Sequence, residues 1–229
     1  ATAEPVRLSP HPPTVILLVG LQGSGKTTIT RLLFRLYDPQ AGRVKVDDVD
    51  LVQARASDIR RRVAMVTQDV HLFRASLRDN VALFSRDIAD DAIVEVLREL
   101  GLGTWYDALP DGLDSVLESA GVGMSAGQQQ LLAFARVFLR DPGVVILDEP
   151  SSRLDPATEQ HVEAAVARLL HGRTGIIIAH RLATVRRVDD VMIVEDGQIA
   201  EIGPRAALAR DSTSRYTELL QTGMEDALS

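Results

Sequence analysis

The stretch VILLVGLQGSGKTT, residues 15–28, decides the fold class of this chain. It opens with a short run of β-branched and apolar residues that Gly20 stops, which is typical of a buried strand. Beyond the glycines, apolar side chains recur at helical spacing, at Ile29, Leu32, Leu33 and Leu36. We therefore expect a strand, a glycine-rich loop and a helix in direct succession.

The loop itself, GLQGSGKT at residues 20–27, matches the P-loop pattern in the required context between a strand and a helix. Its glycines allow backbone N–H groups to turn inward around phosphate oxygens, and the start of the helix adds about half a positive charge. Lys26 is expected to reach the β- and γ-phosphates, and the Thr27 hydroxyl to coordinate Mg²⁺. The predicted phosphate-binding residues are Gly20, Gly23, Ser24, Gly25, Lys26, Thr27 and Thr28.

A second apolar run, VVILDEP at residues 144–150, ends in an acidic pair. Its apolar residues place Asp148 at the C-terminal end of a strand, which is where open α/β sheets bind ligands. We expect Asp148 to hold Mg²⁺ and Glu149 to polarise an attacking water molecule. This pair supplies the acidic partner that a P-loop needs.

The rest of the chain alternates strand-like and helical segments, which predicts an α/β fold with a mostly parallel sheet and helices on both faces. From about residue 72 to 143 the pattern becomes helical, most clearly at 89–100 and 125–140. We therefore predict a single domain over residues 1–229, with an α/β core at 1–71 and 144–229 and an inserted helical subdomain at 72–143.

Composition excludes several classes of protein. The absence of cysteine excludes a disulfide framework and thiolate metal sites. A net charge of −7 opposes a general attraction to nucleic acid, and we expect the run Arg60, Arg61 and Arg62 to form a solvated helix face. No apolar segment approaches the roughly 18 residues that span a bilayer. A soluble, cytoplasmic chain is expected.

Residues 121–136, GVGMSAGQQQLLAFAR, resemble the signature motif of ATP-binding-cassette (ABC) ATPases, usually spelled LSGGQ. The matching residues are Met124, Ser125, Ala126, Gly127 and Gln128. A serine hydroxyl, glycine N–H groups and a helix N-terminus form an anion site suited to a γ-phosphate. In the family this phosphate belongs to a nucleotide on another subunit, so the resemblance implies a head-to-tail dimer of two nucleotide-binding domains.

Further family markers follow in the expected order. The segment MVTQDVHLF resembles the Q-loop, SSRLD resembles the D-loop, and IIIAHRLATV resembles the switch segment. The resemblance implies that Gln68 contacts Mg²⁺ and the attacking water, and that His180 reaches the γ-phosphate. It also implies that Gln128 and Asp155 contribute to nucleotide binding.

Other stretches, such as FRLYDPQAGRVKVDD and LFRASLRDNVALF, resemble the nucleotide-binding domain of an ABC exporter in particular. The resemblance implies a RecA-like core that binds and hydrolyses ATP with Mg²⁺. It further implies a partner transmembrane domain, whose coupling helix is received by the helical subdomain and the Q-loop region. In such a transporter the domain lies at the cytoplasmic face of the membrane.

Two alternatives remain open at this point. GLQGSGKTT also looks like the loop of signal-recognition-particle GTPases, which suggests GTP or a hybrid chain, although no DTAGR-like or TKxD segment is present. The second alternative is a domain that binds nucleotide with little or no hydrolysis. Ala126 favours it, because alanine adds a methyl group where the backbone approaches phosphate and restricts the backbone angles open to glycine.

Overall fold

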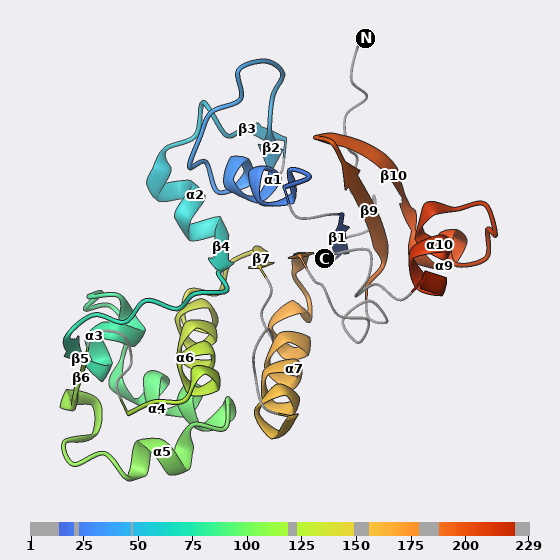
Figure 1. Ribbon diagram of the computed structural model, residues 1–229. Helices are drawn as coiled ribbons and strands as arrows, with labels where there is room; N and C mark the ends of the chain where they lie inside the picture. Colours follow the sequence, from blue (N-terminus) through green and yellow to red (C-terminus); the bar gives the residue numbers. More distant parts are fainter. Residues whose placement is uncertain are drawn as a thin grey trace. The chain divides into compact units, whose positions relative to one another are not determined.

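The computed structural model describes residues 14–20, 23–46, 48–118, 123–148, 156–178 and 188–222 (Figure 1). The chain divides into two compact units. Unit 1 comprises Ala1–Val63, Gly143–Asp148 and Leu170–Ser229, and unit 2 comprises Ala64–Pro142 and Glu149–Leu169. The chain passes from unit 1 to unit 2 within strand β4 (Val63–Val66).

Unit 1 is built on a mostly parallel sheet, as predicted. Its strands are β1 (Val15–Val19), β7 (Val144–Asp148), β8 (Thr174–Ile178), β9 (Asp190–Glu195) and β10 (Gln198–Pro204). They lie in the order β10-β9-β1-β8-β7, and only β10 runs antiparallel to its neighbour. Such a sheet needs helical crossovers between its parallel strands, which agrees with the alternating pattern of the sequence.

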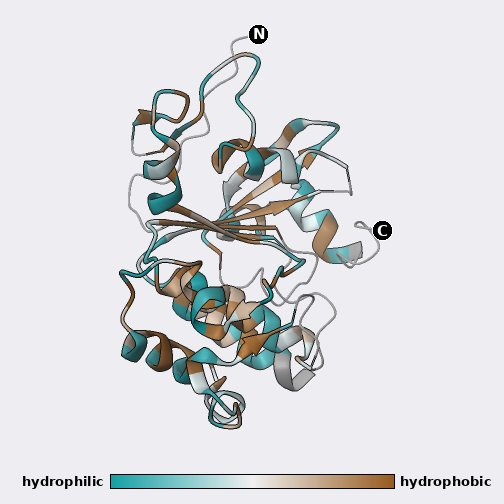
Figure 2. Ribbon diagram, turned by 90° about the vertical axis from the view of Figure 1, so that its left-hand side faces the viewer, coloured by the Kyte–Doolittle hydropathy of each residue, from teal (hydrophilic) through white to brown (hydrophobic). Residues whose placement is uncertain are grey.

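The strands of this sheet consist mainly of buried apolar residues. Strand β1 is buried at every position, and β7, β8 and β9 are buried over most of their length. Continuous runs of Val, Ile and Leu are typical of parallel strands that are covered on both faces. The brown colour along the central strands in Figure 2 follows the same pattern.

The remaining elements of unit 1 are short. They are α1 (Lys26–Leu33), β2 (Lys45–Val46), β3 (Val49–Asp50), α2 (Ala56–Arg62), α9 (Arg205–Leu208) and α10 (Arg215–Thr222). Helix α1 ends at Leu33, because Arg35 adopts a φ of 51° and its guanidinium donates to the Ala54 carbonyl at 2.6 Å. The three arginines at 60–62 are exposed in the last turn of α2, as predicted.

Unit 2 is mainly helical. Its elements are the hairpin of β5 (Ala75–Ser76) and β6 (Val116–Leu117), with α3 (Leu77–Ala82), α4 (Asp90–Glu99), α5 (Gly103–Asp107), the 3₁₀ helix η1 (Gly112–Asp114), α6 (Ala126–Phe138) and α7 (Pro156–Leu170). Helices α4 and α6 confirm the two strongest helical predictions. Helix α7 also groups with this unit, which the sequence pattern does not predict. No helix in the described ranges is long and apolar enough to cross a bilayer.

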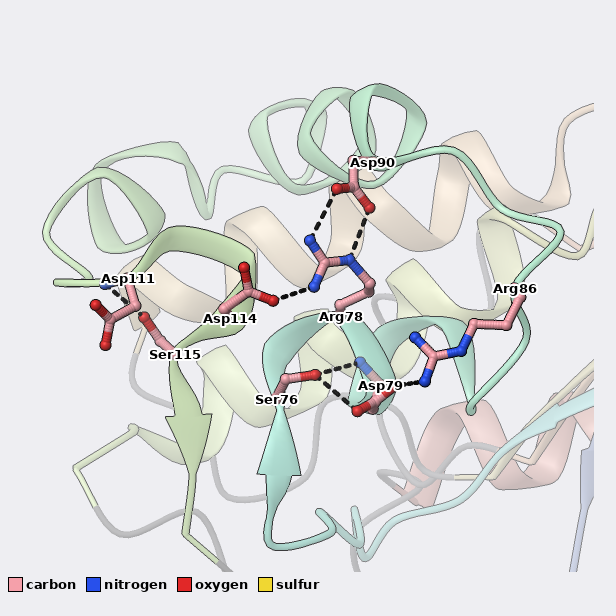
Figure 3. A network of polar contacts seen from close by, with 8 residues as sticks. All are labelled: Ser76, Arg78, Asp79, Arg86, Asp90, Asp111, Asp114 and Ser115. Atoms are coloured by element: carbon pink, nitrogen blue, oxygen red, sulfur yellow. Dashed lines mark hydrogen bonds and ion pairs between the residues drawn. The ribbon is translucent and has the colours of Figure 1, made fainter.

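One guanidinium ties three elements of unit 2 together (Figure 3). Arg78 on α3 donates to both carboxylate oxygens of Asp90 on α4, at 2.7 and 2.8 Å, and to the carboxylate of Asp114 in η1. Such a two-pronged contact is geometrically specific. The hydrogen bonds from Arg78 hold the pKa of Asp90 below its ordinary range.

Candidate nucleotide-binding site

The glycine-rich loop connects β1 to α1 within unit 1. Gly25 caps α1 with a φ of 109°, a left-handed backbone conformation that residues with a side chain rarely adopt. Helix α1 begins at the next residue, Lys26. Because the first N–H groups of a helix have no partner within it, they are available to a bound anion.

Two polar side chains of this loop are buried, namely Ser24 and Lys26, each 6% exposed. The Lys26 ammonium donates to the carbonyl of Gly20, so its charge is turned back over the loop. The Ser24 hydroxyl has no hydrogen-bond partner among the described residues. An unsatisfied buried polar group costs about 1–3 kcal/mol, and an acceptor oxygen in the loop would remove that cost. The loop therefore fits a phosphate group.

The end of β9 and the β9–β10 turn contact the glycine-rich loop. A Cβ atom built on Gly20 would lie 2.1 Å from the Val194 carbonyl oxygen, so only glycine fits there. The Gly197 N–H donates to the Ser24 carbonyl at 3.0 Å. Val194 and Gly197 are not among the residues predicted for the site. The available signal was the dipeptide Asp196-Gly197, which is typical of a two-residue hairpin turn and has φ angles of 48° and 75° here.

Asp148 and the loop lie at the same edge of the sheet. Asp148 in β7 and Leu18 in β1 both pair with Ile178 in the intervening strand β8. With neighbouring strands about 4.8 Å apart, the Cα atoms of Asp148 and Leu18 are roughly 10 Å apart. The loop begins two residues after Leu18, and Thr27 is exposed in the first turn of α1. Thr27 and Asp148 offer oxygen ligands of the kind that Mg²⁺ prefers.

The signature residues begin helix α6 in unit 2. The Ser125 hydroxyl accepts from the Gln128 N–H at 3.1 Å, and the Gln128 side-chain oxygen accepts from the Ser125 N–H at 2.9 Å. This reciprocal pair is a capping box, which orients both side chains. Gly127 is buried and Ala126 is the first helical residue. Because Ala126 does not have a positive φ, the expected backbone restriction by alanine does not arise.

The other predicted residues are distributed as follows. Gln68 follows β4 in unit 2, is half-buried, and makes no hydrogen bond with another described residue. Gly23 and Thr28 lie at the exposed surface of the loop and of α1. Glu149, Asp155 and His180 lie outside the described residues.

The fold and the loop define a P-loop nucleotide-binding protein of the α/β class. A sequence model of the ABC transporter family matches residues 3–152. The chain is 41% identical over 207 residues to an ATP-dependent lipid A-core flippase of Burkholderia thailandensis, which covers 90% of this chain and 35% of the flippase. It is 36% identical over 208 residues to ABC transporter B family member 21 of Arabidopsis thaliana, covering 91% of this chain and 16% of that protein.

A solved structure gives the same result. The structure of a bacterial Atm1-family ABC exporter with ATP bound is similar, with a TM-score of 0.82 and 31% identity. The match covers 91% of this chain and 37% of the exporter. The chain belongs to the ABC transporter family, as an exporter-type nucleotide-binding domain, and spans about a third of the length of the flippase it matches. The family match includes the P-loop, and nothing in these comparisons supports a hybrid origin.

Proposed function

We propose that this domain binds ATP with Mg²⁺ and hydrolyses it in a head-to-tail dimer, driving transport through a partner transmembrane domain. The buried Ser24 hydroxyl, which lacks a partner among the described residues beside the buried Lys26, carries this proposal. An uncompensated hydroxyl and a buried cation in one loop favour a polyanionic ligand over a purely structural turn.

The phosphate chain is bound by residues of unit 1. The Lys26 ammonium exchanges the Gly20 carbonyl for phosphate oxygens, and the Ser24 hydroxyl and the loop N–H groups, from Gly20 to Thr28, complete the contacts. Thr27, Gln68 and Asp148 would hold Mg²⁺, which when bound neutralises charge on the phosphates. ATP is the proposed nucleotide, because the chain lacks the TKxD segment with which GTPases read guanine.

Hydrolysis depends on residues that position water and charge. Glu149 acts as the general base on the attacking water, while Gln68 orients that water and His180 contacts the γ-phosphate. Ser125, Gly127, Gln128 and Asp155 complete the site on the partner's nucleotide. A contact supplied in this way by another subunit is worth about 10³ or more in rate for comparable enzymes.

The surface that receives the transmembrane partner includes an exposed aromatic pair in unit 2. The rings of Phe73 and Phe84 pack edge to face with centroids 5.4 Å apart, yet the residues are 47% and 52% exposed. Exposed aromatic groups of this kind are characteristic of binding surfaces. Phe73 lies five residues after Gln68, so a helix docked here would act close to the Q-loop.

A hydrolysis assay with ATP and GTP over a dilution series tests the proposal. We expect turnover per molecule to fall on dilution, Glu149→Gln to abolish turnover while retaining binding, and Lys26→Ala to weaken binding. Lys45→Ala is the matched control, because Lys45 is the other lysine of the chain and is exposed in β2. Binding without turnover at any concentration would favour the non-hydrolysing module. Constant turnover per molecule would refute the dimer requirement.

A further inference from the structure

Arg136, in the last turn of α6, is partly buried in unit 2. Its Nε donates to the Asn80 carbonyl at 2.9 Å, its Nη1 to the His71 carbonyl at 3.0 Å, and its Nη2 approaches the Asn80 side-chain oxygen at 3.4 Å. These acceptors are all neutral, and no carboxylate in the described part of the chain pairs with Arg136. A partly buried guanidinium is favourable only when its donors are satisfied, so this geometry constrains both acceptor residues.

Asn80 extends the contact to the segment that follows Gln68. Its side chain is fully buried and forms two hydrogen bonds with Phe73, accepting from the N–H at 2.8 Å and donating to the carbonyl at 2.9 Å. The same amide donates to the carbonyls of Ala75 and Ser76. Residues 71–76 are therefore held by Asn80 and Arg136 together.

Helix α6 connects this fixed segment with the signature motif. Ser125 caps the helix eleven residues before Arg136, a distance of about 16 Å along the axis. Much of α6 is buried, and it packs on α3 and α4, which favours its behaving as one rigid element. Gln68 lies three residues before His71, which Arg136 binds.

We propose that Arg136 is a positioning residue, which acts through Asn80 and the segment 71–76 to set the place of Gln68 relative to Ser125. The inference rests on the proposed ATPase function. A movement of the segment 71–76 is then transmitted through the Arg136 guanidinium and α6 to Ser125. A movement of Ser125 is transmitted to the segment by the same route.

The test compares Arg136→Lys with Arg140→Lys. Lysine keeps the charge but cannot reproduce the planar set of donors. Arg140 is exposed just beyond α6, so its replacement is the matched control. We expect Arg136→Lys to lower kcat for ATP by between about 10- and 100-fold, since misplacement of a positioning group has effects of this size. KM should change less than twofold because the phosphate loop belongs to unit 1.

A double-mutant cycle separates positioning from general destabilisation. In the Gln68→Ala background we expect Arg136→Lys to have less than a twofold further effect on kcat, because the residue through which it acts is absent. An equal loss in both backgrounds would overturn the inference, as would an unchanged kcat in the single variant. Should Arg136→Lys fail to fold, Asn80→Ser removes the Nδ2 donors to Phe73, Ala75 and Ser76 without placing a charge at this fully buried position, and it should reproduce the same result.

Hydrogen exchange provides a readout that does not depend on hydrolysis. If the wild-type chain binds ATP without turnover, the proposed function fails but the positioning contact is still measurable. We expect exchange of the Phe73 amide to accelerate at least about tenfold in Arg136→Lys and to be unchanged in Arg140→Lys. Equal exchange in the three proteins would overturn the inference by itself.

Discussion

The N–H of Gly197 donates a hydrogen bond of 3.0 Å to the carbonyl of Ser24, joining the β9–β10 turn to the middle of the phosphate loop. The two residues are far apart in the sequence but belong to the same unit. This bond fixes the backbone carbonyl of Ser24. The hydroxyl of the same residue is buried and has no hydrogen-bond partner among the described residues, so it needs a second contact, which a bound phosphate would supply. The loop is therefore supported by the sheet before nucleotide binds, which reduces the ordering cost of binding.

Gly20→Ala tests how closely the loop lies on β9. The new Cβ would meet the Val194 carbonyl oxygen at 2.1 Å, which requires the backbone to shift. We expect a loss of about 1–3 kcal/mol in the free energy of unfolding and a loss of ATP binding, measured by urea denaturation and titration. Gly172→Ala is the control, because Gly172 also has a positive φ but has open space around it. Retention of ATP affinity in Gly20→Ala would contradict the close contact.

Ser24→Ala separates the folding role of this hydroxyl from its binding role. Removing a buried group that lacks a partner should leave the free energy of unfolding unchanged or raise it by about 1 kcal/mol without nucleotide. ATP affinity should fall roughly tenfold, because a hydrogen bond to a charged oxygen is lost. Ser214→Ala is the contrasting variant: this buried hydroxyl donates to Glu201 at 2.9 Å, so its loss should lower stability and leave ATP binding unchanged. Identical behaviour of the two variants would argue against a ligand at Ser24.

Local signals in the sequence were sufficient to predict the centre of the fold. The strand before the glycine loop, the strand that ends at Asp148 and helix α6 each follow from short apolar patterns and cap residues. The placement of Asp148 beside the loop also follows, because parallel strands bring their carboxyl ends to one edge. The Ser-x-x-Gln spacing also carried the signal for the capping role of Gln128, which was predicted only as a nucleotide-binding residue.

Contacts between distant segments could not be predicted in the same way. The support of Gly20 by Val194 depends on the register of β1 against β9, which no local pattern determines. The binding of His71 by Arg136 depends likewise on how α6 packs, since an arginine on a helix is exposed in most cases. The early end of α1 reflects a single backbone angle at Arg35, which the apolar spacing does not show.

The Arg78 network makes the stability of unit 2 depend on pH (Figure 3). Arg78 lowers the pKa of Asp90 in the folded state. The stabilisation that this contact gives is therefore fully present above the pKa that Asp90 has in the unfolded chain, and it is lost as the pH falls through the pKa of Asp90 in the folded chain. We expect Arg78→Gln to destabilise the domain at pH 7, with a difference from wild type that shrinks below about pH 4, the ordinary range of Asp. Urea denaturation at several pH values measures this difference. A difference in unfolding free energy that stayed constant down to pH 2 would show that the ion pairs of Arg78 do not contribute. Arg74→Gln is the control, because the Arg74 side chain is much more exposed than that of Arg78.

Phe84→Ser tests the aromatic pair as the contact for the transmembrane partner. Phe84 is 52% exposed, so its replacement should leave the unfolding free energy and ATP binding of this domain close to wild type. In the complete transporter we expect transport-coupled ATPase activity to fall roughly tenfold, because truncating an aromatic anchor in an interface costs about 1–2 kcal/mol. Ile202→Ser is the matched control, since Ile202 is similarly exposed on β10 of unit 1. Reduced coupling in the Ile202 variant with normal coupling in the Phe84 variant would place the docking surface on unit 1 instead, and normal coupling in both would exclude the ring pair from the contact.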